Sequence, residues 1–369
     1  MSYTLCTFNV NNLFIRYRFG HTFPGDRSGK SANGKARRQG RDRRATTRNI
    51  PDRRSDSIRT FGYLPLNQPG MFEVFSPEQR ELAAQTVRRG GRKAPDILCL
   101  QEVESLIALR RFNEEFLDGE YEHAVLLDSR DLRQIDVGLL SKVPITRVRS
   151  WMDEPDPKDR TKYLFSRDCL EVDLELNKSG SRTLTLFINH LKSKLADSAA
   201  EKKEAAEKRQ RQAKGIMRIV GNRFDGDAFK KGWFAVLGDF NDEPASRALR
   251  PLYEGSGLVD ALARLPKPEA RWTEWYRGAN QVSQLDHLLI SPALDRATRH
   301  SLPQIERRGI GFARTLSDHT FGPRQTKLVT QDDDPSPIAL DFQFGRFPGV
   351  GVQNLASDHC PIFLEIATA

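Results

Sequence analysis

Short apolar runs recur along almost the whole of this 369-residue chain, and they restrict its fold more than any other feature does. Runs of this length, bounded by turn residues, predict buried strands. Segments typical of helices separate several of them. Strands that alternate with helices predict an α/β sandwich and argue against an all-β fold. We expect strands near the N-terminus, at 95–102, and at 135–141, 168–176, 182–191, 232–240, 284–291 and 360–366.

Two segments predict helices. The first begins at Ser76 and Pro77, which suit the N-cap and the first helical position, and it ends at Gly90 and Gly91. The second, residues 196–224, is rich in Ala, Glu, Lys, Gln and Arg, all of which favour helix formation.

The composition is that of an ordinary globular protein with enough residues for one large domain or two small ones. No apolar run approaches the roughly 20 residues that a membrane-spanning helix needs. The N-terminus lacks the basic and apolar regions of a secretion signal, so we expect a cytoplasmic protein without a membrane partner. A leader cleaved from a longer precursor would leave the same N-terminus.

The cysteines exclude a zinc site of the usual kind. They are widely spaced, lie in or beside apolar runs, and form no Cys-x-x-Cys pair. We therefore predict buried reduced thiols at Cys6, Cys99, Cys169 and Cys360.

Basic charge is concentrated in one segment. The whole chain carries a net charge of +9, whereas residues 16–59 alone contain 14 Lys and Arg against 4 Asp. Since this Arg-rich segment has no helical or strand periodicity, we predict a long insertion or loop. It is either a solvated charge run without a specific role or a basic arm that contacts a polyanion. A second, irregular insertion is expected at about 300–356.

Polar side chains follow most of the predicted strands. Taken singly, each has a simple explanation, since Asn and Asp form turns and a lone His is more often a packing residue. Taken together, carboxylates and amide oxygens suit a hard cation such as Mg²⁺, and histidines with acidic partners can move protons. The set indicates a metal-assisted hydrolase of phosphate esters. Its members are Asn9, Asn11, Glu102, His190, Asp239, Asn241, Asp242, Asp286, Asp358 and His359.

Seven motifs give a resemblance to a known family. In chain order they are "TFNVNNLF", "PDILCLQEV", "IDVGLLSKVPI", "FINHLKSK", "VLGDFNDEP", "QLDHLLIS" and "SDHCPIFLEI". The chain resembles the endonuclease/exonuclease/phosphatase superfamily, which includes deoxyribonuclease I-like nucleases. "NHLKSK" with "LDHLLIS" is most similar to a bacterial branch related to extracellular nucleases.

The resemblance implies a single catalytic domain over residues 1–369. Its fold would be a four-layer α/β sandwich, with two packed mixed β-sheets flanked by helices. The cofactor would be Mg²⁺, or Mn²⁺, with Glu102 as the principal ligand and Asp358, Asp239 and Asn241 as further ligands. One metal is expected, because Asn11 stands where some members carry Asp or Glu.

The resemblance also implies roles for the other polar residues. Asp239 would orient or deprotonate the attacking water, and Asn241 would hold a phosphate oxygen. His359, polarised by Asp286, would contact the scissile phosphate, and His190 is a candidate acid for the leaving oxygen. Asn9 would support the metal and phosphate network. We also expect substrate contacts from Asn11, Asn241, Arg167 and Lys192.

Three classes of function remain open. The first is a Mg²⁺-dependent nuclease that acts as a monomer on nucleic acid, with DNA as the expected substrate and either endonuclease or exonuclease cleavage. The second is a phosphatase or phosphodiesterase for inositol phosphates or a phospholipid such as sphingomyelin, because one fold serves many substrates. The third is a binding protein that has lost catalysis. In "RWTEWYRG", the residues Trp272, Trp275 and Tyr276 either stack on a substrate or pack in the core.

The tripeptide Ser-Asp-His occurs twice, at Ser317–His319 and Ser357–His359. The second copy leads into Pro361 and an apolar strand, which would fix its position at the edge of a sheet. The first copy leads into Gly322 and Pro323 within the irregular segment. We therefore predict that His359, and not His319, is the catalytic histidine.

Overall fold

The computed structural model describes most of the chain. The described residues are 2–14, 77–131, 133–177, 182–194, 198–276, 281–310, 327–329, 338–339, 345–351 and 354–367. The basic segment 16–59 and the first Ser-Asp-His copy therefore lie outside the described residues, as does Ser76. Of the segment 300–356, only parts are described.

Two mixed sheets of six strands face each other in the described part of the chain. The first has the order β15-β18-β1-β2-β4-β3, and the second has the order β11-β14-β10-β9-β8-β5. The strands of the first sheet are β1 (Ser2–Leu13), β2 (Ile97–Val103), β3 (His123–Leu126), β4 (Asp136–Ser141), β15 (Gln304–Ile305) and β18 (Ile362–Ala367). Those of the second are β5 (Ile145–Arg149), β8 (Cys169–Glu175), β9 (Thr183–His190), β10 (Trp233–Asp239), β11 (Val259–Asp260) and β14 (Asp286–Ile290).

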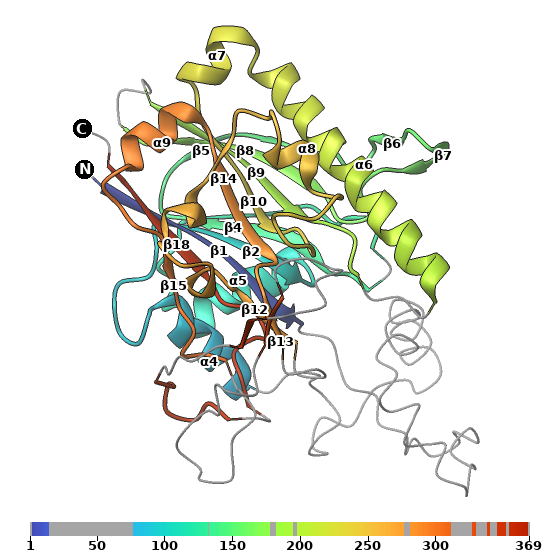
Figure 1. Ribbon diagram of the computed structural model, residues 1–369. Helices are drawn as coiled ribbons and strands as arrows, with labels where there is room; N and C mark the ends of the chain where they lie inside the picture. Colours follow the sequence, from blue (N-terminus) through green and yellow to red (C-terminus); the bar gives the residue numbers. More distant parts are fainter. Residues whose placement is uncertain are drawn as a thin grey trace, which may run out of the picture.

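Helices cover the outer faces of both sheets (Figure 1). Helices α4 and α5 lie over the first sheet, and α6 lies over the second with α7 and α8 beside it. The helices are α4 (Pro77–Val87), α5 (Leu106–Phe116), α6 (Ala199–Arg223), α7 (Gly226–Lys231), α8 (Arg250–Tyr253) and α9 (Pro292–Thr298), with short 3₁₀ turns at Ala261–Arg264 and Pro268–Ala270.

The alternation of side chains along the strands explains the four layers, because successive residues point to opposite faces of a sheet. In β1, Leu5 packs between the two sheets, whereas Phe8 packs on the outer face under α4 and α5. In β10, Leu237 packs between the sheets and Val236 faces α6. The predicted four-layer α/β sandwich is thus confirmed, with one core between the sheets and one under each helical layer.

The sequence-based elements agree with this architecture. Each predicted strand contains or overlaps an observed strand, and the two predicted helices correspond to α4 and α6. Helix α6 begins with a capping box in which the Ser198 side chain accepts from the Glu201 N–H and the Glu201 side chain accepts from the Ser198 N–H. Helix α5 and the short strands were not predicted.

Two small sheets lie outside the sandwich. One pairs β6 (Pro155–Asp156) with β7 (Asp159–Tyr163), and the other has the order β12-β13-β16-β17. The latter's strands are Glu274–Tyr276, Gln281–Ser283, Lys327–Val329 and Ile338–Ala339. Trp272 and Trp275 are buried beside this sheet, which agrees with the packing interpretation of "RWTEWYRG", but Tyr276 is 51% exposed.

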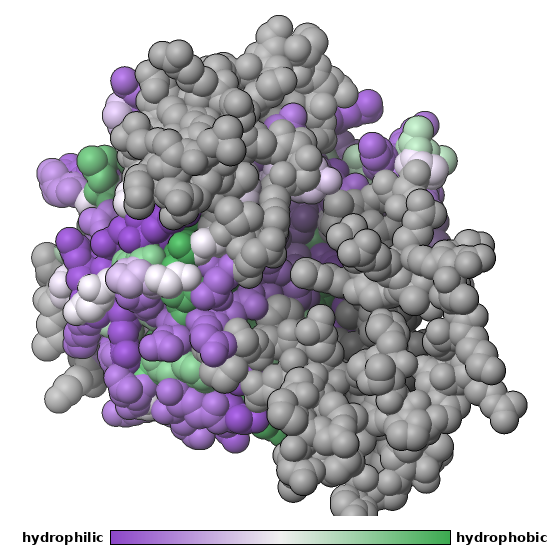
Figure 2. Space-filling view, turned by 90° about the horizontal axis from the view of Figure 1, so that it is seen from below, coloured by the Kyte–Doolittle hydropathy of each residue, from purple (hydrophilic) through white to green (hydrophobic). Residues whose placement is uncertain are grey.

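Other expectations concern the surface and the thiols. All four cysteines are buried and free, as predicted. No helix in the described part of the chain is both long and apolar enough to cross a membrane. Seen from the side of α4, the described surface is largely hydrophilic with small apolar patches (Figure 2).

Candidate active site

The pairing of strands brings the predicted polar residues to one end of the sandwich. In the second sheet, Asp239 at the end of β10 lies opposite His190 of β9 and opposite Asp286 of β14. In the first sheet, β1 and β2 run parallel and end at the same edge, which places Asn9 beside Gln101 and close to Glu102. The loop before the antiparallel strand β18 adds Asp358 and His359 to that edge.

Asp239 is the centre of the hydrogen-bond network. Its Oδ2 accepts from Asn9 Nδ2 at 2.9 Å and from Asn241 Nδ2 at 3.0 Å, so the two amides fix the carboxylate. The side chain is buried. Burial raises the pKa of Asp239 to about 7, and the Asp286 carboxylate adds to this shift while His359 opposes it.

His359 is held on both sides. Its Nδ1 lies 2.8 Å from Asp286 Oδ2, and its Nε2 lies 3.9 Å from Asp239 Oδ2. Ser357 Oγ accepts from the His359 N–H at 3.0 Å and donates to the Asn9 carbonyl at 2.7 Å, which ties this loop to β1. Burial alone would lower the pKa of His359, but the carboxylates of Asp286 and Asp239 raise it well above its usual value.

His190 has the opposite electrostatic environment. Its Nε2 lies 3.3 Å from Asp239 Oδ2 and 3.9 Å from Glu102 Oε1. Burial, with the nearby cations Arg167 and Arg133, lowers the pKa of His190 well below its usual value. The pKa values of the two imidazoles are therefore shifted in opposite directions, which suits them to different roles in proton transfer.

Several site residues have unusual backbone conformations. Glu102 has φ of +65°, Asn241 of +55° and Asn11 of +47°, all in the left-handed region that few residues other than glycine adopt. The pairing of β1 with β2 and of β2 with β4 shifts register near Asn9 and Glu102. These bulges turn the side chains out of the regular alternation at the edge of the sheet.

The donor atoms suit a hard divalent cation. Burial raises the pKa of Glu102, and the neighbouring Asp358 carboxylate adds to the shift although Arg133 lowers it. The repulsion between two half-buried carboxylates is relieved by a bound cation, and oxygen ligands are those that Mg²⁺ prefers. Ligand atoms of Asp239, Asp286 and His359 also lie within 4.8 Å of one another. Within this group of three residues, however, Asp286 Oδ2 already bonds to His359. Glu102 and Asp358 are therefore the better metal ligands.

The family follows from a comparison of the sequence with family models. The model described as the Endonuclease/Exonuclease/phosphatase family matches residues 6–319. The chain belongs to this family. Members of the endonuclease/exonuclease/phosphatase family hydrolyse phosphoric esters and typically depend on a divalent metal, so the site described above is that of a phosphoric ester hydrolase.

Solved structures with a similar fold are remote in sequence. The human nocturnin catalytic domain with bound sulfate is 16% identical, over 80% of this chain and 89% of that one, with a TM-score of 0.48. Truncated TDP2 from Caenorhabditis elegans is 14% identical, over 100% and 98%, with a TM-score of 0.48. A family protein from Bacteroides thetaiotaomicron is 15% identical, over 99% and 98%, also with a TM-score of 0.48. No curated protein matches the sequence significantly.

The family match ends at His319, within the first Ser-Asp-His copy. In the structure, the imidazole that bonds to Asp286 belongs to the second copy, at His359. The first copy lies outside the described residues. The choice between the two copies therefore stays a prediction.

Three predicted residues lie beside or behind the hydrogen-bond network of Asp239 and His359. Asn11 donates its backbone N–H to Asn9 Oδ1 at 3.0 Å and so positions Asn9. Arg167 is 2% exposed and donates to the Leu191 carbonyl at 2.6 Å, so it is a buried residue behind the site. Lys192 follows Leu191 and is exposed.

Sequence reasoning missed four residues that shape this family site. Thr273 Oγ1 accepts from the Asp286 N–H at 2.9 Å, and Ser357 ties the His359 loop to β1. Asp131 and Arg133 lie in the loop before β4. Asp131 bonds directly to Arg167, and Arg133 is linked to Arg167 through the Asp131 carboxylate. Only Ser357 carried a signal, because it belongs to the Ser-Asp-His motif.

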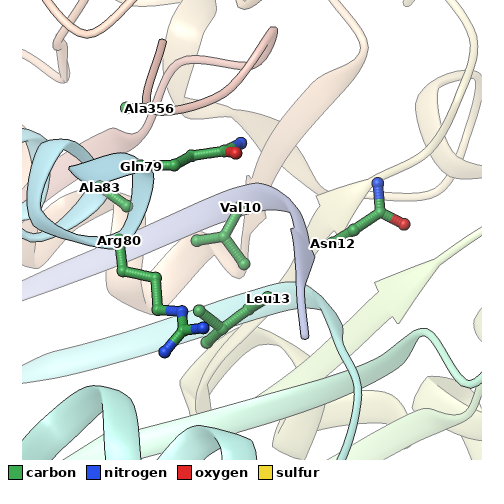
Figure 3. A pocket seen from close by; sticks show the side chains of 7 residues that line it. All are labelled: Val10, Asn12, Leu13, Gln79, Arg80, Ala83 and Ala356. Carbon is green, nitrogen blue, oxygen red and sulfur yellow. The ribbon is translucent and has the colours of Figure 1, made fainter. Parts of the chain in front are cut away.

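A separate hollow lies beside the end of β1, against α4 (Figure 3). It contains none of the carboxylates or imidazoles of the site. Its lining is largely aliphatic, and Asn12 and Arg80 lie on opposite sides of β1. The residues around it are Val10, Asn12, Leu13, Gln79, Arg80, Ala83 and Ala356.

Proposed function

We propose that this hydrolase is a Mg²⁺-dependent nuclease that cleaves phosphodiester bonds of DNA. The observation that carries the proposal is the meeting of Asp239 and the Asp286–His359 pair with the Glu102–Asp358 carboxylates at one edge of the sandwich. A phosphodiester is anionic and resists attack by a second anion. A bound cation, a fixed base and a charged hydrogen-bond donor together overcome this resistance.

The chain's own groups would divide the work. A divalent metal held by Glu102 and Asp358 would offset charge on the nonbridging oxygens. Asp239, fixed by the amides of Asn9 and Asn241, would orient the attacking water and accept its proton. The cationic His359 would donate to the phosphate, with Asp286 holding its other nitrogen and thereby its orientation.

The role of His190 in this proposal differs from the one implied by the resemblance. An acid for the leaving oxygen needs a protonated imidazole, which burial and the neighbouring cations disfavour. Its Nε2 lies between the carboxylates of Asp239 and Glu102. We assign His190 to interaction with the Asp239 carboxylate and not to proton donation.

Charge supports nucleic acid as the substrate. Residues 16–59 follow the first motif directly and contain 14 Lys and Arg against 4 Asp. Neutralisation of backbone phosphates by Lys and Arg gives affinity that does not depend on sequence. A substrate with many phosphates therefore suits this chain better than one with a single phosphate.

The test is a substrate panel with two variants. Supercoiled DNA, linear DNA, RNA, inositol phosphates and sphingomyelin are incubated with the protein, with Mg²⁺ or with EDTA. DNA should be cleaved only with Mg²⁺, and Glu102→Gln should lower the rate on the order of 10²-fold or more. Glu115→Gln, an exposed carboxylate on α5, is the control and should keep the wild-type rate. Activity confined to inositol phosphates or sphingomyelin would overturn the proposal.

A further inference from the structure

Asp242 follows Asn241 in the turn after β10, and the water attack described above gives it no role. Its side chain is buried, and its carboxylate lies 2.9 Å from Arg209 Nε of α6 and 3.1 Å from Lys194 Nζ. Its carbonyl oxygen lies 2.9 Å from His287 Nε2 of β14. Asp242 is thus held from two sides, which restricts the turn that carries Asn241.

His287 is fully buried and bonded at both ring nitrogens. A carbonyl oxygen only accepts hydrogen bonds, so the Nε2 atom beside the Asp242 oxygen must carry a proton. Burial lowers the pKa of His287 to about 4, and the imidazole is therefore neutral at pH 7. Its Nδ1 then accepts a hydrogen bond from the Tyr253 hydroxyl at 2.5 Å. Tyr253 thereby sets the tautomer in which His287 donates to Asp242.

The same imidazole packs against the turn itself. The rings of Phe240 and His287 are stacked, with their centroids 4.6 Å apart and their planes inclined by 11°. Both side chains are fully buried, and the Phe240 N–H donates to the Leu285 carbonyl at 2.8 Å. His287 therefore contacts the residues on either side of Asn241, one with its ring face and the other with Nε2.

Asn241 lies between these two contacts and needs them to keep its conformation. Its φ of +55° is in the left-handed region, where a residue with a Cβ atom stays only if its surroundings hold it. Its N–H donates to Asp239 Oδ1 at 2.8 Å, and its Nδ2 donates to Asp239 Oδ2 at 3.0 Å. Both oxygens of the proposed base thus take their orientation from Asn241. Misplacement of a catalytic group by about 1 Å can cost on the order of 10²-fold in rate.

The strand β14 divides two neighbouring residues between the site and the outer helical layer. Successive side chains of a strand point to opposite faces, so Asp286 bonds to His359 at the site, whereas His287 points outward as Leu289 does. Tyr253 ends the short helix α8, which lies beside α6 on the outer face of the second sheet (Figure 1). A line of contacts therefore runs from the outer layer to the turn at the active site.

We propose that His287, with its tautomer set by Tyr253, is a positioning residue that holds the turn 240–242 so that Asn241 keeps the Asp239 carboxylate aligned with the attacking water. The inference rests on the proposed role of Asp239 as the base, but not on DNA as the substrate. It also gives Asp242 a part, because its carbonyl is the atom that His287 holds.

The experiment measures hydrolysis of bis(p-nitrophenyl) phosphate, a phosphodiester without a nucleoside. Tyr253→Phe removes the hydroxyl and keeps the ring. His287→Phe keeps a ring against Phe240 and removes both hydrogen bonds, whereas His287→Gln restores a donor toward the Asp242 carbonyl. Tyr121→Phe is the matched control, because it removes a buried hydroxyl that has no hydrogen-bond partner among the described residues. Thermal unfolding gives the folded fraction of each variant, to which its rate is referred.

Tyr253→Phe should lower kcat about 3- to 10-fold with little change in KM, as expected for the loss of one neutral hydrogen bond. His287→Phe should lower kcat about 10- to 100-fold, because it leaves the Asp242 carbonyl unpaired, and His287→Gln should recover part of this loss. Tyr121→Phe should leave kcat unchanged. An unchanged kcat in folded Tyr253→Phe, or a loss in KM alone, would overturn the proposal. If His287→Phe does not fold, Tyr253→Phe alone decides.

A second measurement does not depend on turnover. In heteronuclear NMR spectra, His287 should carry its proton on Nε2, and the signals of the Asn241 side-chain amide should shift in Tyr253→Phe but not in Tyr121→Phe. A proton on His287 Nδ1, or Asn241 signals that do not move, would refute the positioning role. A wild-type protein that does not cleave DNA would overturn the proposed nuclease function and leave both of these tests in place.

Discussion

At the scale of single residues, the site depends on backbone conformations that stability alone does not favour. Glu102 has φ of +65° at the end of β2. For a residue with a Cβ atom, the left-handed conformation costs roughly 1–2 kcal/mol. The surrounding strands therefore hold Glu102 in a strained position, as is common at functional sites.

The strain predicts a difference between two substitutions that remove the same carboxylate. Glu102→Gly and Glu102→Ala should both abolish most of the activity. Glu102→Gly should have a free energy of unfolding about 1 kcal/mol higher than Glu102→Ala, because glycine adopts this φ without a Cβ clash. Denaturant unfolding of the two variants measures the difference. Equal stabilities would show that the position is not strained.

The sequence allowed the prediction of some site residues but not of others. Glu102, Asp239 and Asp286 could be predicted, because each stands where an apolar run meets a sheet edge and because the family motifs contain them. Arg133 could not be predicted. Its position depends on Asp131, whose carboxylate is shared with Arg167 36 residues away in the chain. No local pattern carries that contact.

At the scale of elements, an ion-pair group joins the β6–β7 hairpin to helix α6. Asp156 Oδ1 accepts from Arg211 Nε at 2.8 Å, and Asp156 Oδ2 accepts from Lys208 Nζ at 2.6 Å. The carboxylate is 4% exposed. Burial alone would raise the pKa of Asp156, but Lys208 and Arg211 lower it to about 2.

This group predicts an acid dependence of stability. A carboxyl whose pKa is lower in the folded state, here about 2 against an ordinary 3.8, stabilises the fold above pH 4 and loses this effect as the pH falls toward 2. At neutral pH, Asp156→Asn should lower the free energy of unfolding on the order of 2 kcal/mol. The difference from wild type should shrink between pH 4 and pH 3 in denaturant titrations. A difference independent of pH would contradict the ionic origin.

The elements differ in how far the sequence determines them. The long strands of both sheets are buried on two faces, so their continuous apolar runs could be recognised. Helix α5 also carried signals, since Ser105 caps it and Leu109 and Phe112 recur on its buried face. The three-residue strands β12 and β13 carried none, because they are too short for a recognisable pattern and their position depends on pairing with each other and on the bridge from Glu274 to His359.

At the scale of the whole molecule, charge is separated between the basic segment and the rest of the chain. Residues 16–59 account for more than the whole net charge of +9, so the catalytic sandwich by itself is close to neutral. The order of motifs allowed the fold class to be predicted. It did not indicate what the basic segment does, because binding of a polyanion depends on charge and not on a pattern of secondary structure.

Deletion of residues 16–59 is therefore the test at this scale. If the segment contacts DNA, the deletion should weaken binding and reduce the dependence of affinity on salt, since each phosphate contact contributes about 0.9 to the slope of log K against log salt concentration. Binding is measured by fluorescence anisotropy at several salt concentrations. A neutral insert of equal length in place of 16–59 controls for chain length. An unchanged salt slope would show that the segment is a solvated charge run and that the sandwich alone binds the substrate.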